Sequence, residues 1–154
     1  FKNATYWSNK KHWQWATVPN DREKASFLKE NILPMQEFGQ LKFVEDGFDA
    51  FDIFYANGHT DAMMIPLLEY QGKKLAFMAD LLPSAGHIPM PYIMGYDTRP
   101  LLTLEDRKRF YKKAIDEDLY LFLEHDAQNE IITLKDTEKG ARLDKVYKYK
   151  ELFD

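Results

Sequence analysis

Three side chains that commonly bind divalent metals stand near the ends of short apolar runs of the sequence. They are His59, Asp80 and His125. The apolar runs cover residues 51–55, 74–79 and 119–123. Without cysteine, zinc takes imidazole nitrogens and carboxylate oxygens as ligands. A strand that ends in such a side chain can hold it at the rim of a sheet, so the three residues predict a shared metal site.

Each of the three also has an ordinary structural interpretation. A single His is more often a structural or surface residue than a ligand, and Asp commonly ends strands as a turn former. The neighbouring residues favour ligands. Gly58 lets the backbone approach closely beside His59, and apolar neighbours put Asp80 at a partly buried rim, where its carboxylate needs a positive partner. A metal ion is one candidate for that partner, and on the residues alone both interpretations stay open.

The elements that must position these residues are mostly strands. Alternating or continuous apolar patterns predict strands at residues 3–8, 41–45, 51–55, 62–70, 74–79, 119–123, 130–135 and 141–149. Gln71-Gly72-Lys73 predicts a hairpin turn. Residues 62–68 are apolar on both faces, which indicates a strand covered on both sides, and Pro66 within it indicates an edge or a bulge.

Two helices and one helical turn are predicted. Residues 12–15 predict the turn, and Asn20 is expected to cap a helix that ends before Pro34. Its inward face would carry Ala25, Leu28 and Ile32. Thr103 is expected to cap the second helix, with a Glu105–Arg109 pair facing outward. Leu104, Tyr111 and Ile115 would face inward.

Composition excludes several classes of protein. The chain has 154 residues, which suits one domain. Its net charge is −4 and Lys and Arg do not cluster, which argues against a nucleic-acid partner. No apolar run is long enough to cross a bilayer as a helix. Cysteine is absent, so any metal site must use His and carboxylate, and we expect a cytoplasmic protein. The chain starts at Phe1 rather than Met, which leaves an export signal upstream open.

The order and spacing of three short motifs around His59, Asp80 and His125 give further information. Gly-His-Thr at 58–60, Ala-Asp at 79–80 and Glu-His-Asp at 124–126 occur in order, with 21 residues from His59 to Asp80 and 45 from Asp80 to His125. This order and spacing resemble the metallo-β-lactamase superfamily, and more narrowly its branch of metal-dependent hydrolases that includes the N-acyl-homoserine lactonases. The stretches 80–89 and 96–100 also look like lactonase-like members, and the resemblance covers nearly the whole chain.

The resemblance implies a fold, a cofactor and an activity. The fold would be α/β, part of an αββα sandwich of metallo-β-lactamase type. His59 would bind one metal and His125 a second, with the Asp80 carboxylate bridging them; zinc is expected, with manganese or iron as alternatives. A metal-bridging hydroxide would attack a lactone or carboxylic ester. Thioester, amide and phosphodiester hydrolysis stay open, because a fold does not fix the substrate.

The sequence departs from the family pattern in two respects. The family's other ligands lie in a His-x-His-x-Asp-His motif, which this chain does not contain; its remaining histidines are His12 and His87. We therefore expect residues 1–154 to be the C-terminal portion of a single domain of this type, inactive alone. Met63 stands where many members carry a further His, which would alter the surroundings of the site rather than its ligands.

The segment 81–100 should form a wall of the substrate cavity, because it follows the bridging carboxylate. Met90, Tyr92, Met94 and Tyr96 predict either contact with an apolar part of a small-molecule substrate or cover for the core. His87 would either donate a hydrogen bond to a substrate oxygen or have a structural role.

Association and an alternative function complete the expectations. Trp7, Trp13 and Trp15 would pack a helix onto a sheet or form a subunit interface. We expect no membrane partner, and an exposed sheet edge predicts a homodimer or aggregation. The alternative function is a non-catalytic, metal-free binding module with a hydrophobic pocket.

Overall fold

The computed structural model describes residues 1–153, and their contacts divide into two compact units. The first unit covers Phe1–Ala50 and the second begins at Phe51. All three predicted metal ligands belong to the second unit, so the fold of that unit determines their geometry. No helix among the described residues is long and apolar enough to cross a membrane.

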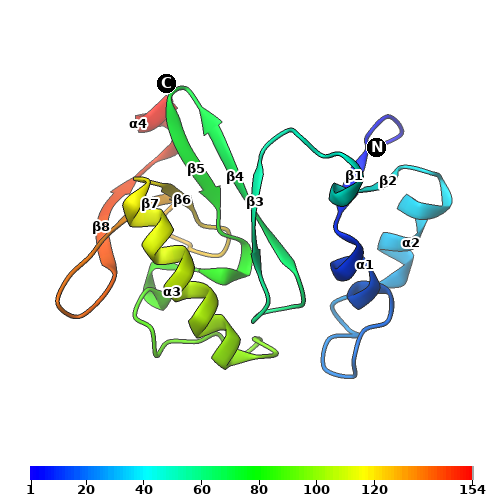
Figure 1. Ribbon diagram of the computed structural model, residues 1–154, viewed down its shortest axis with the longest axis horizontal. Helices are drawn as coiled ribbons and strands as arrows, with labels where there is room; N and C mark the ends of the chain where they lie inside the picture. Colours follow the sequence, from blue (N-terminus) through cyan, green and yellow to red (C-terminus); the bar gives the residue numbers. More distant parts are fainter. Residues whose placement is uncertain (154) are drawn as a thin grey trace. The chain divides into compact units, whose positions relative to one another are not determined.

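The first unit packs two helices with a small parallel sheet (Figure 1). Its elements are β1 (Tyr6–Ser8), α1 (Lys10–Thr17), α2 (Lys29–Glu37), β2 (Leu41–Phe43) and the 3₁₀ turn η1 (Val44–Asp46). Asn9 caps α1, because its side-chain oxygen accepts the N–H of His12 at 2.7 Å. Trp13 of α1 meets Phe43 of β2 edge-on, with ring centroids 6.5 Å apart. This contact confirms the prediction that a Trp-rich helix packs onto a sheet.

The predicted helix after Asn20 is wrong in its bounds. Asn20 does accept the backbone N–H of Glu23 at 3.1 Å, but residues 21–27 form turns and α2 starts only at Lys29. The carboxylate of Glu23 also accepts from the indole N–H of Trp15, so this capping motif stabilises a loop. Pro34 lies inside α2, where its fixed φ suits a helix and the missing N–H removes one intrahelical bond.

The second unit is built on a six-stranded mixed sheet (Figure 1). Its strands are β3 (Asp52–Ala56), β4 (Met63–Tyr70), β5 (Lys73–Phe77), β6 (Tyr120–Phe122), β7 (Ile131–Lys135) and β8 (Arg142–Tyr147). They lie in chain order, and every neighbouring pair is antiparallel except β5 and β6. A parallel pair needs a crossover connection, and the helix α3 (Pro100–Asp116) lies in it.

Two local predictions about β4 have different outcomes. The hairpin to β5 is confirmed, and Gln71 and Gly72 both have positive φ, at 48° and 71°. Positive φ at both central residues is what a two-residue hairpin turn of type I′ requires. Pro66 indicated an edge or a bulge; β4 as a whole is not an edge strand, because it runs between β3 and β5. The β4–β5 ladder begins only at Leu67, so at Pro66 the strand has a partner on one side only.

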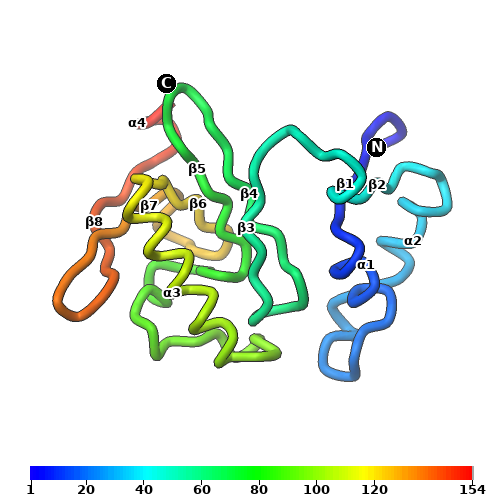
Figure 2. Tube along the Cα trace, in the orientation of Figure 1, coloured from blue at the N-terminus to red at the C-terminus, as the bar shows by residue number. Residues whose placement is uncertain are grey.

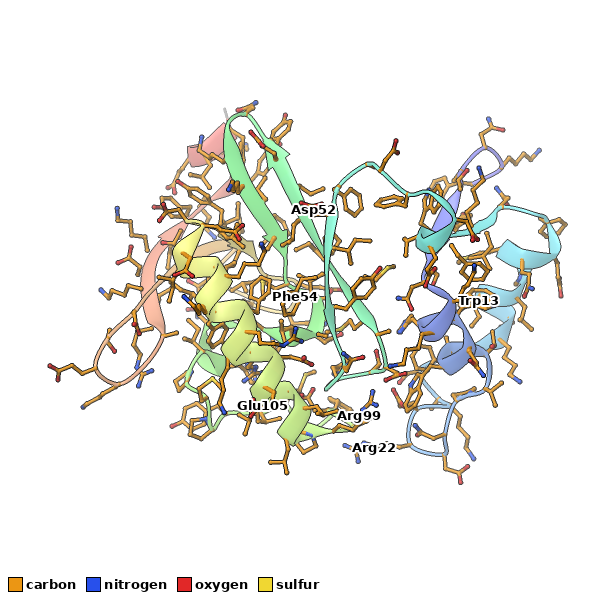
Figure 3. All side chains as sticks on the ribbon, in the orientation of Figure 1. Trp13, Arg22, Asp52, Phe54, Arg99 and Glu105 are labelled. Carbon is orange, nitrogen blue, oxygen red and sulfur yellow. The ribbon has the colours of Figure 1, made fainter. Side chains whose placement is uncertain are left out.

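Helix α3 packs across the sheet and carries both apolar and polar buried side chains. Figure 3 shows Phe54 pointing from β3 towards α3, where its ring meets Phe110 at 5.1 Å. Thr103, Asp106 and Arg107 are also buried on this helix. The apolar core around them includes Ile65, Met78, Leu81, Leu82, Tyr111, Leu121 and Ile132.

The prediction for this helix needs two corrections. The helix begins at Pro100, which suits the first helical position, so Thr103 lies within its first turn instead of capping it. Arg109 pairs with Asp106 at 2.6 Å and lies 4.8 Å from the Phe54 ring, so the expected pair with Glu105 does not form. A short terminal helix, α4 (Tyr149–Phe153), was not predicted.

Tyr111 gives a test of this core at alkaline pH. Its hydroxyl is buried without a hydrogen-bond partner among residues 1–153, and burial raises the pKa of the phenol to about 12 from 10.0. As the pH rises, the phenol of Tyr111 therefore ionises in the unfolded chain before it ionises in the folded protein. The free energy of unfolding is unaffected by this group below about pH 10 and falls as the pH rises from about 10 to about 12. We expect Tyr111→Phe to be neutral or stabilising at pH 7. At about pH 11 the variant should retain roughly 1–2 kcal/mol that the wild type has lost, measured by urea unfolding.

Phenylalanine keeps the ring of residue 111 in the core, so this comparison isolates the hydroxyl. An equal fall in stability for both proteins between about pH 10 and pH 12 would contradict the assignment to Tyr111.

Candidate metal centre

His59 lies in the loop between β3 and β4, and the start of α3 holds that loop. One carboxylate oxygen of Asp106 accepts the backbone N–H groups of Asn57 at 2.6 Å and Gly58 at 3.0 Å. The N–H of Arg99 donates to the carbonyl of Gly58 at 2.9 Å. A Cβ added at Gly58 would lie 2.2 Å from the backbone nitrogen of Thr103. Glycine is therefore required here by the close approach of the loop to the helix.

The ring of His59 is oriented by a buried carboxylate. Nδ1 lies 2.9 Å from Oδ1 of Asp97, whose other oxygen accepts the hydroxyl of Thr103 at 2.8 Å. The Asp97 side chain is fully buried. An ionised carboxylate only accepts hydrogen bonds, so Nδ1 of His59 donates to Asp97, while Nε2 faces Asp80. A carboxylate that fixes the tautomer of a histidine in this way is typical of metal-ligating histidines.

Asp80 lies just after β5, in the 3₁₀ turn η2 (Ala79–Leu81). The end of β5 is tied to β6, because the N–H of Met78 donates to the carbonyl of Phe122 at 3.0 Å. Ala79 has a φ of +43°, an uncommon value for a residue with a side chain. Such backbone persists only where the surroundings hold it, and it often occurs at functional sites.

His125 follows β6, and the next residue fixes its loop. The carboxylate of Asp126 accepts the N–H groups of Ala85, Gln128 and Asn129 at 2.9–3.0 Å, together with the side-chain amide of Asn129. These hydrogen bonds hold the pKa of Asp126 well below its usual range, against an opposing effect of burial. The bond to Ala85 joins the loop of His125 to the segment that follows Asp80.

The structure brings the three predicted ligands together, with Asp80 in the middle. Nε2 of His59 lies 3.4 Å from Oδ2 of Asp80, and Nε2 of His125 lies 3.3 Å from Oδ1. These distances exceed those of a well-formed N–H···O bond. They match the edge of a tetrahedron around a zinc ion, which is about 3.3–3.5 Å for bonds of about 2.0–2.2 Å. Nε2 of His59 and the carboxylate of Asp80 attract each other only through a proton or a cation between them.

The donors are arranged as two pairs that share a carboxylate. Among residues 1–153 no group of three or more His, Cys, Asp or Glu side chains is placed to hold one metal ion. Because His59 and His125 face opposite oxygens of Asp80, each ion would receive one imidazole and one carboxylate oxygen from this chain. The residues present therefore fit part of a two-metal site.

The predicted substrate contacts lie on the segment between Asp80 and α3, which Figure 2 shows as a winding path. His87 ends the 3₁₀ turn η3 (Ala85–His87), and its Nδ1 lies 2.8 Å from Oγ of Ser84. Burial, followed by the nearby charge of Arg107, lowers the pKa of His87. Tyr92 and Tyr96 are exposed. The contact of these three residues with a substrate stays a prediction.

Sequence reasoning missed the polar residues that support the site. They are Asp97, Thr103, Asp106, Arg107 and Asp126. A signal was present in α3, where Thr103, Asp106 and Arg107 occupy the same helical face as Phe110 and Tyr111. Polar residues on the buried face of a helix must bond to something buried, and here they bond to the loops of the site.

Known proteins resemble this chain in structure rather than in sequence. No protein-family model matches the sequence, and no curated protein matches it. Among solved structures, AbOPH, a hydrolase in the beta lactamase superfamily, gives a TM-score of 0.77 at 17% identity over 95% of this chain and 56% of its own. A probable metal-dependent hydrolase from Staphylococcus aureus gives 0.78 at 21% identity, over 95% and 52%. AidC, a dizinc quorum-quenching lactonase in complex with a homoserine product, gives 0.69 at 23% identity, over 95% and 56%.

These matches establish the fold. The chain has part of the metallo-β-lactamase fold, a mixed α/β arrangement with a six-stranded mixed sheet and flanking helices, as the sequence predicted. It spans about half the length of these structures. At sequence identities this low, a shared fold does not establish a shared activity, because function depends on the residues of the site.

The contact of Gly58 with α3 gives a test of the site's framework. We expect Gly58→Ala to destabilise the protein by roughly 1–3 kcal/mol, since its Cβ would overlap helix backbone that cannot move cheaply. The matched control is Gly95→Ala, where an added Cβ meets nothing within 4 Å. Denaturant unfolding of the two variants compares them directly. Equal stabilities would show that the loop of His59 is not held against α3.

Proposed function

We propose that the protein containing this chain is a metal-dependent hydrolase that acts on a lactone or a carboxylic ester. The observation that carries the proposal is the carboxylate of Asp80, which faces His59 with one oxygen and His125 with the other, at 3.4 and 3.3 Å. Bridging by a carboxylate is a way to hold two metal ions close together. The fold shared with dizinc and other metal-dependent hydrolases supports the same class.

In this proposal the chain supplies part of the ligand set for two divalent ions, most simply zinc. His59 and one oxygen of Asp80 would hold one ion, and His125 and the other oxygen would hold the second. Asp97 would keep His59 in the tautomer that presents Nε2, and Thr103 would keep Asp97 in place. Bound zinc lowers the pKa of water towards 7 and polarises a carbonyl, which suits ester or lactone hydrolysis. Manganese or iron would serve the same donors.

The substrate class is inferred from one segment and two relatives. AidC and an N-acyl homoserine lactone hydrolase were each solved with an N-hexanoyl-homoserine product. In this chain the segment after Asp80 carries Met90, Tyr92, Met94 and Tyr96, which would contact an apolar part of the substrate such as an acyl chain. The imidazole of His87, whose pKa is lowered, would be neutral at pH 7 and could donate to a substrate oxygen.

The test measures metal content and turnover in the same protein. We expect about two zinc, manganese or iron ions per complete polypeptide, and hydrolysis of members of a chromogenic lactone and ester panel. Asp80→Asn should lower metal content and reduce kcat/KM by at least about 10²-fold, because the amide bridges metals poorly. The control is Asp116→Asn on the exposed end of α3, where the carboxylate pairs only with Lys112 in the described structure, and it should behave as wild type.

A protein that holds no metal and hydrolyses no member of the panel would refute the hydrolase proposal. Such a result would favour the alternative, a non-catalytic binding module. Normal metal content and turnover in Asp80→Asn would refute the bridging role of Asp80 but not the hydrolase proposal.

A further inference from the structure

We propose that Arg107 is a positioning residue that keeps Asp80 in its bridging place by fixing the segment 81–92 that follows it. This inference rests on the proposed function and deepens it, because it names a side chain outside the ligand set on which metal binding would depend.

Arg107 contacts this segment at three points. It is fully buried on α3. Its Nε donates to the carbonyl of Leu81 at 2.9 Å, and its Nη1 donates to the carbonyls of His87 at 3.0 Å and Tyr92 at 2.7 Å. One guanidinium therefore joins the beginning, the middle and the end of a segment that has no long helix or strand of its own. A planar group with several fixed donors can serve three carbonyls that converge on it.

The guanidinium charge of Arg107 is buried, which is costly in free energy. All three of these hydrogen bonds go to backbone carbonyls, and Nη2 has no acceptor among residues 1–153. Taking a guanidinium out of water is costly, and its hydrogen bonds to three carbonyls must offset that cost. The convergence of these three carbonyls accounts for an arginine at this position.

The effect of Arg107 reaches Asp80 through one peptide unit. Leu81, whose carbonyl accepts from Nε, is the residue after Asp80 in η2. Ala79, the residue before Asp80, has a φ of +43°, and backbone of this kind relaxes unless its surroundings hold it. Without the Arg107 bond, η2 can relax and move both oxygens of Asp80 away from the two histidines.

A second anchor on the same segment sharpens the inference. Asp126, next to His125, accepts the N–H of Ala85 at 2.9 Å. The segment is therefore held to the His125 loop on one side and to α3 on the other. Loss of Arg107 alone would leave the segment bonded to the loop of His125 but would remove its bonds to α3. The segment could then shift relative to α3 and to His59, whose loop is bonded to α3.

The experiment compares Arg107→Met and Arg107→Lys with the control Ile132→Ala in the full protein. Ile132→Ala removes buried volume from β7 and should lower the global stability, while leaving every bond of Arg107 in place. The first readout is amide hydrogen exchange of the metal-free protein at Leu81, His87 and Tyr92, whose N–H groups each donate to a nearby carbonyl. The second readout is zinc affinity by calorimetry.

We expect both Arg107 variants to lose exchange protection at these amides beyond any change in global stability, and to bind zinc roughly 10–100-fold more weakly. Arg107→Lys should not restore exchange protection or zinc affinity, because a single ammonium on a flexible side chain cannot reproduce the several fixed donors of the guanidinium. Ile132→Ala should lower protection across the core in proportion to its stability and leave zinc affinity unchanged.

Two results would overturn the proposal. One is a uniform loss of protection in Arg107→Met with wild-type zinc affinity, which is the pattern of a merely structural residue. The other is full rescue by lysine, which would assign the effect to charge alone. If the wild type binds no zinc, the proposed function fails by itself, and the exchange readout still decides whether Arg107 fixes the segment.

Discussion

The site depends on the hydrogen-bonding requirement of three polar side chains buried on α3. Thr103, Asp106 and Arg107 are buried, where an unpaired polar group is costly, so each must find a partner. Their partners are the loops that carry the candidate ligands. Asp106 holds the turn before His59, Thr103 holds the carboxylate that orients His59, and Arg107 holds the residue after Asp80. The buried face of this helix therefore also fixes the loops of the site.

The sheet supplies the other part of the geometry. The parallel pairing of β5 with β6 brings the ends of these strands together, and Asp80 and His125 follow them. The bond between Asp126 and Ala85 then joins the two loops directly. His59 lies in the loop between β3 and β4, and two sets of contacts hold this loop. Asp97 and Thr98, just before α3, bond to His59, and Asp106 of α3 accepts the N–H groups of Asn57 and Gly58.

The sequence predicted much of this arrangement and missed a definable part. Strands were predictable because apolar runs bounded by turn residues have a local signature. The grouping of His59, Asp80 and His125 was predictable because each follows such a run, and their role as metal ligands stays a prediction. The predicted helix end before Pro34 failed because proline is tolerated inside a helix where the fold accepts the lost bond, and the predicted start at Thr103 failed because Pro100 suits the first helical position. The supporting role of Asp106 and Arg107 was not predictable, because their partners are backbone atoms brought close only by folding.

Anomalous X-ray scattering from crystals of the protein grown with zinc tests the central claim most directly. The account predicts anomalous peaks beside the Asp80 carboxylate, one next to Nε2 of His59 and the other next to Nε2 of His125, with Arg107 still bound to the carbonyl of Leu81. Zinc bound elsewhere, or a carboxylate of Asp80 that holds no ion at saturating zinc, would contradict it.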